Sequence, residues 1–240
     1  MRRKPTLPPL LLGCSPLIGA GQFGRKSAEY YARFYLQPEN MVRLFERSFE
    51  LGVKAVQLLH DRPIDALLEA SMRTGVKPYV VYSTELFGAK LQQALDKLKP
   101  LSPQVVAVHA EVADRHDWSR VMERLRIIEE FDATPGIATH KPGVTIPWIE
   151  KEDLPVDVIL APLNKIGYGM EPDFQQSLRA IEECSRAIVA IKPLAAGRLR
   201  ATEAFEFVYK YVGCAAVGVA SEDEMSQTYQ AAREAYAESR

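Results

Sequence analysis

The sequence predicts an α/β protein, a single (β/α)8 barrel that spans residues 1–240 as one domain. Short apolar, β-branched runs alternate with longer amphipathic stretches along the whole chain, which is typical of strands that alternate with helices. The runs are continuously hydrophobic rather than alternating, as strands are when both faces are covered. A doubly wound sheet is the alternative, but that fold normally uses fewer strands over this length. We therefore favour the TIM barrel.

Eight strands are expected, each a run of five or six mostly apolar residues. They lie at Leu10–Cys14, Val53–Leu58, Pro78–Tyr82, Val105–His109, Thr134–Ala138, Val156–Leu160, Ala187–Lys192 and Cys214–Val219.

The intervening segments carry helix start and stop signals, such as Pro38 before one apolar-periodic stretch and Gly52 after it. The helices are expected at Met41–Leu51, Ile64–Thr74, Phe87–Leu98, Asp117–Phe131, Pro172 to about Arg186, Thr202–Tyr211 and from Ser221 onward, with the weakest near Pro147–Asp153. Residues 1–9 form a basic, proline-rich tail. Residues 15–37, rich in Gly and Tyr, form a long first βα loop that we expect to act as a lid or rim element.

Composition and charge exclude several classes of partner. The chain carries 30 basic and 31 acidic side chains, which argues against nucleic acid or a membrane surface and favours a small-molecule ligand. No run of about 18 apolar residues exists, so no membrane span is expected. The three cysteines form no C-x-x-C pair, so they indicate buried thiols in a reducing, cytoplasmic setting. The oligomeric state stays open.

Histidines gather where the predicted strands end. His60, His109 and His140 each follow a strand within about two residues, and in a barrel these ends form the active-site mouth. His109 and Glu111 would lie on one side of the chain if it is still extended there. Together with Glu85 they could hold a metal ion, but the spacing matches no metal motif. We predict a functional pocket with at least one of these histidines, and no metal.

Lys192 ends the seventh strand, where a lysine could form a Schiff base, bind an anion or simply be solvated at the rim. The turn Pro193–Arg198 and the segment Gly218–Ser221 offer small residues and a helix start, which favour phosphate binding. The acidic residues Glu222–Glu224 oppose an anion at that helix start.

These segments resemble the aldo/keto reductase family over much of the chain. The segment Lys192–Leu199 is close to the family's strand-seven motif and is the most specific match. The other matches are Leu12–Ser15 with Gly19–Gly21, Phe49–Val53, Val108–His109, Gly136–His140 and Val217–Ser221.

The resemblance implies an oxidoreductase that acts on a small carbonyl compound with NADP or NAD. The candidate catalytic residues are His109, Lys192, Glu85, Gln57 and His60. The candidate cofactor-binding residues are Thr139, His140, Asn164, Pro193, Leu194, Gly197, Arg198, Gly218 and Ser221.

The departures from that family are concentrated in the catalytic set of Asp, Tyr, Lys and His. Of the four, only His109 keeps its type; the Asp position falls on Gln57, the Tyr near Arg62 and the Lys near Thr84-Glu85. Without the phenol and its lysine, the family's route of carbonyl protonation is absent. Leu163 stands where the family has an aromatic side chain that stacks on nicotinamide, and Glu222 and Asp223 replace basic residues that hold the adenosine phosphate. The mechanism is therefore non-standard.

Two alternatives stay open beside the oxidoreductase. One is a non-redox barrel enzyme, a lyase, isomerase or metal-assisted hydrolase, that uses the strand-end His and Glu side chains. The other is a binding protein that kept the barrel and lost the chemistry.

Overall fold

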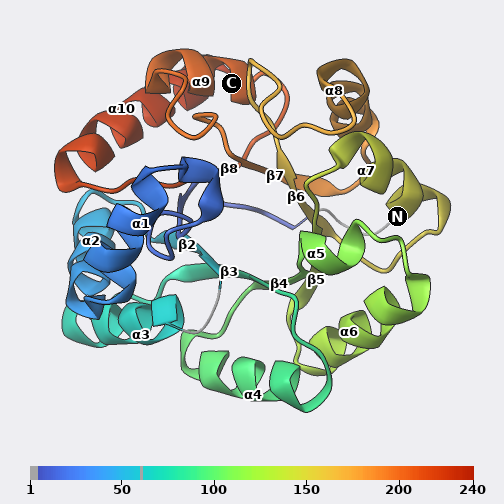
Figure 1. Cartoon of the computed structure of the whole chain (residues 1–240), viewed down its shortest axis with the longest axis horizontal. Helices are drawn as coiled ribbons and strands as arrows, with labels where there is room; N and C mark the ends of the chain where they lie inside the picture. Colours follow the sequence, from blue (N-terminus) through green and yellow to red (C-terminus); the bar gives the residue numbers. More distant parts are fainter. Residues whose placement is uncertain (1–4, 60–61) are drawn as a thin grey trace.

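A computed structural model describes residues 5–59 and 62–240 of the chain. Within these residues, eight parallel strands close into a barrel in sequential order, which confirms the predicted fold class (Figure 1). The strands are β1 Leu10–Gly13, β2 Ala55–Leu59, β3 Tyr79–Thr84, β4 Val105–Val108, β5 Thr134–Ala138, β6 Val158–Pro162, β7 Ala187–Ile191 and β8 Ala215–Val217.

Helices surround the strands, as the amphipathic stretches predict (Figure 1). They are α1 Lys26–Tyr30, α2 Pro38–Glu50, α3 Arg62–Thr74, α4 Gly88–Leu98, α5 Ala110–Ala113, α6 Trp118–Glu130, α7 Pro142–Lys151, α8 Phe174–Glu183, α9 Ala201–Val208 and α10 Glu222–Glu238. Short 3-10 turns lie at Gly21–Phe23 and Lys99–Leu101, and a π-helix lies at Tyr31–Tyr35.

The strands are mostly apolar because each faces two cores. Leu11, Val105 and Val189 belong to a small cluster inside the barrel. Their neighbours Leu12 and Val106 belong to the larger cluster between the sheet and the helices. Since successive strand residues point to opposite faces, both sets must be hydrophobic. This two-sided burial fixes the barrel and leaves polar side chains to gather at its ends.

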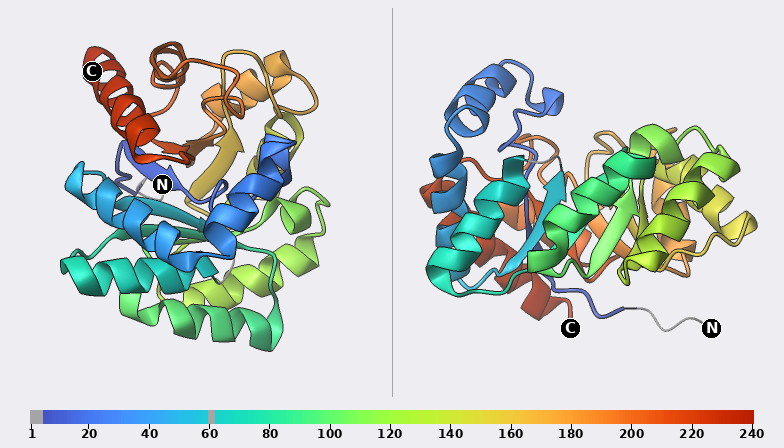
Figure 2. Two further views of the ribbon diagram at one scale, coloured as in Figure 1. Left: turned by 60° about the vertical axis from the view of Figure 1, so that its left-hand side comes forward. Right: turned by 90° about the horizontal axis from the view of Figure 1, so that it is seen from below.

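The segment 15–37 is more ordered than the expected loop. It contains the 3-10 turn, α1 and the π-helix, and it stands at the end of the barrel toward which the strands point (Figure 2). Phe34 is buried, and the ring of Tyr30 lies between the rings of Phe23 and Phe34 at centroid distances of 5.3 and 6.5 Å. The aromatic side chains therefore pack the segment into a rim element, as expected.

Two local expectations need correction. The chain does not stay extended after β4: His109 caps the one-turn helix α5, so His109 and Glu111 are not on one side of a strand. The weakest expected helix begins earlier than predicted, at Pro142, and carries Pro147 in its interior. Pro142 is compatible with a first helical position, because its missing N–H would have no partner there.

The described part of the chain contains no helix that is both long and apolar enough to cross a membrane. The three cysteines all lie within it and are buried as thiols.

Candidate functional site

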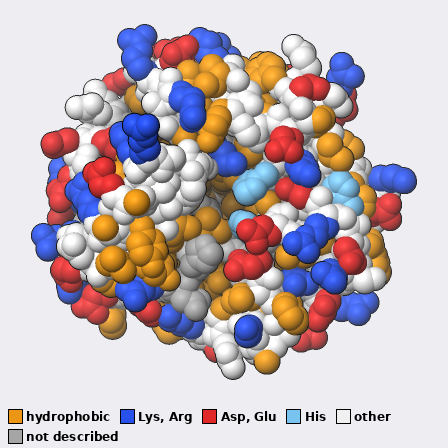
Figure 3. Space-filling view, viewed as in Figure 1, with side chains coloured by type: hydrophobic (Ala, Val, Ile, Leu, Met, Phe, Trp, Pro, Cys, Tyr) orange, Lys and Arg blue, Asp and Glu red, His pale blue; other side chains and the backbone are white. Residues whose placement is uncertain are grey.

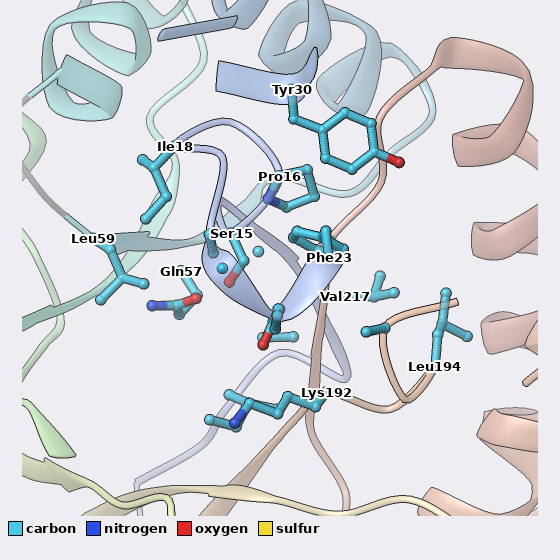
Figure 4. Close-up of a pocket in the computed structure, with 18 of the residues that line it drawn as sticks. Ser15, Pro16, Ile18, Phe23, Tyr30, Gln57, Leu59, Lys192, Leu194 and Val217 are labelled. Atoms are coloured by element: carbon cyan, nitrogen blue, oxygen red, sulfur yellow. The ribbon is translucent and has the colours of Figure 1, made fainter. Parts of the chain in front are cut away.

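A cavity of about 790 Å³ opens at the carboxyl ends of the strands. Its size is that of a small-molecule site. Polar side chains line its floor, and the segment 15–37 forms one wall with Ser15, Pro16, Ile18, Phe23 and Tyr30 (Figure 4). Histidine side chains appear at the hollow near the centre of this face, with acidic side chains beside them (Figure 3).

His109 is held in place by the start of α5. Its ring Nδ1 accepts a hydrogen bond of 3.3 Å from the backbone N–H of Glu111, because His109 is the N-cap residue. The ring lies nearly perpendicular to that of His140, with 5.8 Å between the ring centroids. Two imidazoles from neighbouring strand ends, β4 and β5, therefore face one cavity.

His140 is anchored through its backbone by Asp114. The carboxylate of Asp114 accepts hydrogen bonds from the His140 N–H at 2.9 Å and from the hydroxyls of Thr139 and Thr145 at 2.5 and 2.8 Å. Burial, followed by the charges of Lys192 and His109, lowers the pKa of His140 from 6.5 to about 4. His140 is therefore neutral near pH 7 and can accept a proton.

Lys192 follows the end of β7 and lines the cavity together with His109 and His140. Its backbone adopts a left-handed conformation with φ of 55°, and its side chain lines the cavity (Figure 4). Burial lowers the pKa of the Lys192 ammonium, while Glu171 and Asp114 oppose this shift. A Cβ atom built at Gly169 would lie 3.2 Å from Lys192 Nζ, so the loop after β6 passes close beside the amine.

The loop after β6 also joins the rim segment. The hydroxyl of Tyr168 donates a hydrogen bond of 3.3 Å to the carbonyl of Gln22, across a separation of 146 residues in the sequence. The guanidinium of Arg198 lies over the Tyr168 ring at 4.3 Å from its centroid. Asn164 is fully buried and fixes this loop through two hydrogen bonds with the backbone of Tyr168.

Most of the sequence-predicted site residues line this cavity. Those present are Gln57, His109, His140, Lys192, Pro193, Leu194, Gly197 and Gly218. The residues that lie outside its lining are Glu85, Thr139, Asn164, Arg198 and Ser221. His60 lies outside the described residues.

The predicted residues outside the lining have structural contacts instead. Thr139 is buried and hydrogen-bonded to Asp114, and Asn164 and Arg198 hold the loop that carries Tyr168. Glu85 offers its backbone carbonyl to the guanidinium of Arg124 at 3.3 Å. Their positions after strand ends place them near the mouth of the barrel, but these positions do not show which side chains line the cavity.

The start of α10 satisfies its own backbone donors. Ser221 Oγ accepts the N–H of Glu224 at 3.2 Å, and the Glu224 carboxylate accepts the N–H of Ala220 at 2.9 Å. This arrangement is similar to a capping box. A carboxylate therefore occupies the positive end of the helix, where the sequence also suggested a phosphate.

Sequence reasoning missed Asp114 and the two cations of the rim segment. Asp114 lies one turn beyond a strand end, and nothing in the local sequence shows that it reaches back to two threonines of the next strand and helix. Arg25 and Lys26 line the cavity because the rim segment folds over it, and they add positive charge to a lining that also contains Glu224 and Glu111. The Gly and Tyr content of residues 15–37 predicted a rim element, but it did not indicate these two cations.

Among the residues that the structure describes, no group of three or more His, Cys, Asp or Glu side chains is arranged to hold a metal ion.

Comparison with solved structures identifies the fold. A proposed aldo-keto reductase from Pseudomonas aeruginosa shares 18% identity over 95% of this chain and 90% of its own length, with a TM-score of 0.68. An aldo/keto reductase from Brucella melitensis shares 10% identity over 96% and 95% of the two chains, with a TM-score of 0.64. No protein-family model matches the chain, and no curated protein matches it either.

These similarities show that the chain has the barrel fold of aldo-keto reductases. Barrels of other chemistry are also similar to it. A thiamine phosphate pyrophosphorylase from Pyrococcus furiosus matches with 14% identity over 85% and 92% of the two chains, at a TM-score of 0.53. Because one fold hosts many activities, function has to be argued from the cavity itself.

Proposed function

We propose that this protein is an oxidoreductase that acts on a small carbonyl compound bound in the mouth of the barrel, with a nicotinamide nucleotide as its redox partner. The observation that carries the proposal is the convergence of His109, His140 and Lys192 in one cavity. These side chains suit the polarisation of a carbonyl oxygen and the movement of its proton. The shared fold of aldo-keto reductases supports the redox class.

The lining of the cavity fits the diphosphate of a nucleotide on its β7–β8 side. Small residues with left-handed backbones, Ala196 and Gly197, line it beside Gly218, so a ligand can approach the main chain closely. Arg25 and Lys26 supply positive charge from the rim segment. When bound, the nucleotide would supply the hydride.

The same lining does not fit a further phosphate at the start of α10. The carboxylate of Glu224 already accepts the N–H of Ala220 there, and Glu222 and Asp223 follow it. Like charges repel an added phosphate, so this arrangement favours NAD(H) over NADP(H).

In the proposed reaction, N–H groups of His109 and Lys192 would donate hydrogen bonds to the carbonyl oxygen and stabilise the negative charge that grows on it. His140 is neutral at pH 7 and would relay the proton. Gln57 lies in the wall with an amide, so it can hydrogen-bond the substrate but cannot supply a charge.

Calorimetric titration with NADH and with NADPH tests the proposal. We expect binding heat and a rise in melting temperature with NADH, a weaker response with NADPH, and loss of NADH binding affinity in Gly197→Val. Gly75→Val, at a remote left-handed glycine with open space around it, is the matched substitution that should leave binding unchanged. Absence of heat and of any melting shift with both nucleotides at millimolar concentration would eliminate the oxidoreductase.

A further inference from the structure

We propose that Lys192 is an amine nucleophile that forms an imine with a carbonyl compound in the mouth of the barrel. The inference rests on the proposed function only for the presence of a carbonyl compound in this cavity, and it does not require the nucleotide. It assigns the site a covalent step that belongs to lyase or aldol-type chemistry.

The Lys192 side chain is placed where it can reach a ligand in the cavity. Lys192 projects from the end of β7 into a cavity large enough for a small molecule, and Figure 4 shows it among the lining residues. The left-handed backbone at Lys192 and the turn that follows it fix where the side chain begins. A nucleophile held at a strand end in this way is already oriented toward its substrate.

The surroundings of Lys192 disfavour its charged form. Two lysines elsewhere pair closely with carboxylates, Lys165 with Glu203 at 2.6 Å and Lys97 with Asp65 at 2.8 Å. For Lys192, no carboxylate of residues 5–59 or 62–240 lies within ion-pairing distance, and Glu171 and Asp114 act on it only at longer range. An ammonium that is largely buried without such a partner is destabilised relative to the neutral amine.

The loop after β6 leaves room at Lys192 Nζ. Gly169 adopts a left-handed backbone, and a Cβ atom there would come within 3.2 Å of Lys192 Nζ. The absence of a side chain therefore keeps one side of the amine accessible. Burial also lowers the pKa of Lys192, which increases the fraction of neutral, nucleophilic amine near pH 7.

The step balances without an oxidant or a reductant. The nitrogen lone pair forms a C–N bond while the carbonyl π pair moves to oxygen, and a proton that leaves nitrogen ends on that oxygen to give a carbinolamine. His140, neutral near pH 7, is the group of the cavity suited to carry this proton. A second proton from solvent allows the oxygen to leave as water, which produces the iminium ion.

Reductive trapping tests the inference on the intact protein. The protein is incubated at pH 7 with glycolaldehyde or pyruvate and sodium cyanoborohydride, and peptide mass spectrometry follows alkylation at each lysine. We expect Lys192 to react faster than the exposed lysines Lys141 and Lys210, because its amine lies in the cavity and burial lowers its pKa. Equal rates at the three lysines with both probes would overturn the proposal.

A variant adds a second readout. In Gly169→Ala, the added methyl group should slow trapping at Lys192 while rates at Lys141 and Lys210 stay unchanged. If this variant does not fold, the ratio of rates in the unaltered protein still decides the question. Selective trapping without nucleotide binding would retain the imine and reject the oxidoreductase, and the reverse result would reject the imine alone.

Discussion

At the scale of single residues, folding strongly alters the protonation of His140, which lines the cavity. Its pKa falls from 6.5 to about 4, chiefly because of burial. Between these two pH values, the unfolded chain binds a proton that the folded protein does not. The free energy of unfolding should therefore decrease as the pH falls from about 6.5 to 4, by up to about 3 kcal/mol.

Nuclear magnetic resonance of the histidine ring protons measures this directly. We expect one ring, assigned through His140→Gln, to titrate well below pH 6.5. The same variant should reduce the dependence of stability on pH in that interval. A His140 ring that titrates at pH 6.5 or above would contradict the arrangement of charges described for this cavity.

Asp114 is the residue that holds His140 in place, and its removal should be costly. Asp114→Ala would leave the hydroxyls of Thr139 and Thr145 and the N–H of His140 without their acceptor. Both threonines are fully buried, so we expect a loss of about 1–3 kcal/mol in urea unfolding. Asp114→Asn keeps one acceptor oxygen and should lose less. Equal stability of Asp114→Ala and the parent protein would show that this network is not formed.

At the scale of elements, the hydroxyl of Ser221 caps the start of α10. Ser221→Ala removes the N-cap acceptor for the N–H of Glu224 and should lower stability by about 1 kcal/mol. Ser226→Ala is the matched control, because Ser226 lies inside the same helix and bonds only the carbonyl of Glu222. Thermal or urea unfolding of the two variants should separate them; similar losses in both would contradict the capping role.

The contact between β8 and the rim segment depends on the absence of a side chain at Gly218. A Cβ atom there would lie 2.6 Å from Pro16 Cδ, whereas a Cβ at Gly21 would meet no atom within 4 Å. Gly218→Ala should therefore displace the rim segment and cost about 1–3 kcal/mol. Gly21→Ala should change stability by no more than about 0.5 kcal/mol. Urea unfolding decides this, and a neutral Gly218→Ala would show that Pro16 packs elsewhere.

At the scale of the whole molecule, the barrel was predictable because its strands face two cores. Uninterrupted runs such as Val105–Val108 can be buried on both sides only in a parallel sheet with outer helices. The boundaries shifted by one to two residues at most strands, because hydrophobicity alone does not mark where the ladder of backbone pairs begins and ends. The helix signals at Pro38 and Gly52 were local and therefore reliable.

The sequence predicts where the site lies, but it does not predict the contacts that its residues make. Strand-end positions identified His109, His140 and Lys192, because a parallel barrel brings those ends together. They did not reveal that His109 caps α5, or that Asp114 holds His140, since both depend on how a loop turns back on itself. The same limit explains Thr139 and Asn164, which follow strands but bond within the protein.

The described residues form a second large hollow besides the mouth of the barrel. A groove of about 890 Å³ lies at the opposite end of the barrel, lined by Tyr79, Gln104 and Glu130 among others. Among the described residues, its lining contains no histidine, and its polar groups come from the starts of strands, the loops before them and the helices α4 and α6. Volume alone would favour this groove, whereas the convergence of His109, His140 and Lys192 favours the mouth.

Hydrogen–deuterium exchange with and without NADH separates the two ends most directly. We predict slower exchange at Lys192–Gly197, at Gly218–Ala220 and in the rim segment, with no change at Tyr79 or Gln104. Protection confined to the groove at the opposite end, or no protection anywhere at millimolar NADH, would contradict the placement of the functional site in the mouth of the barrel.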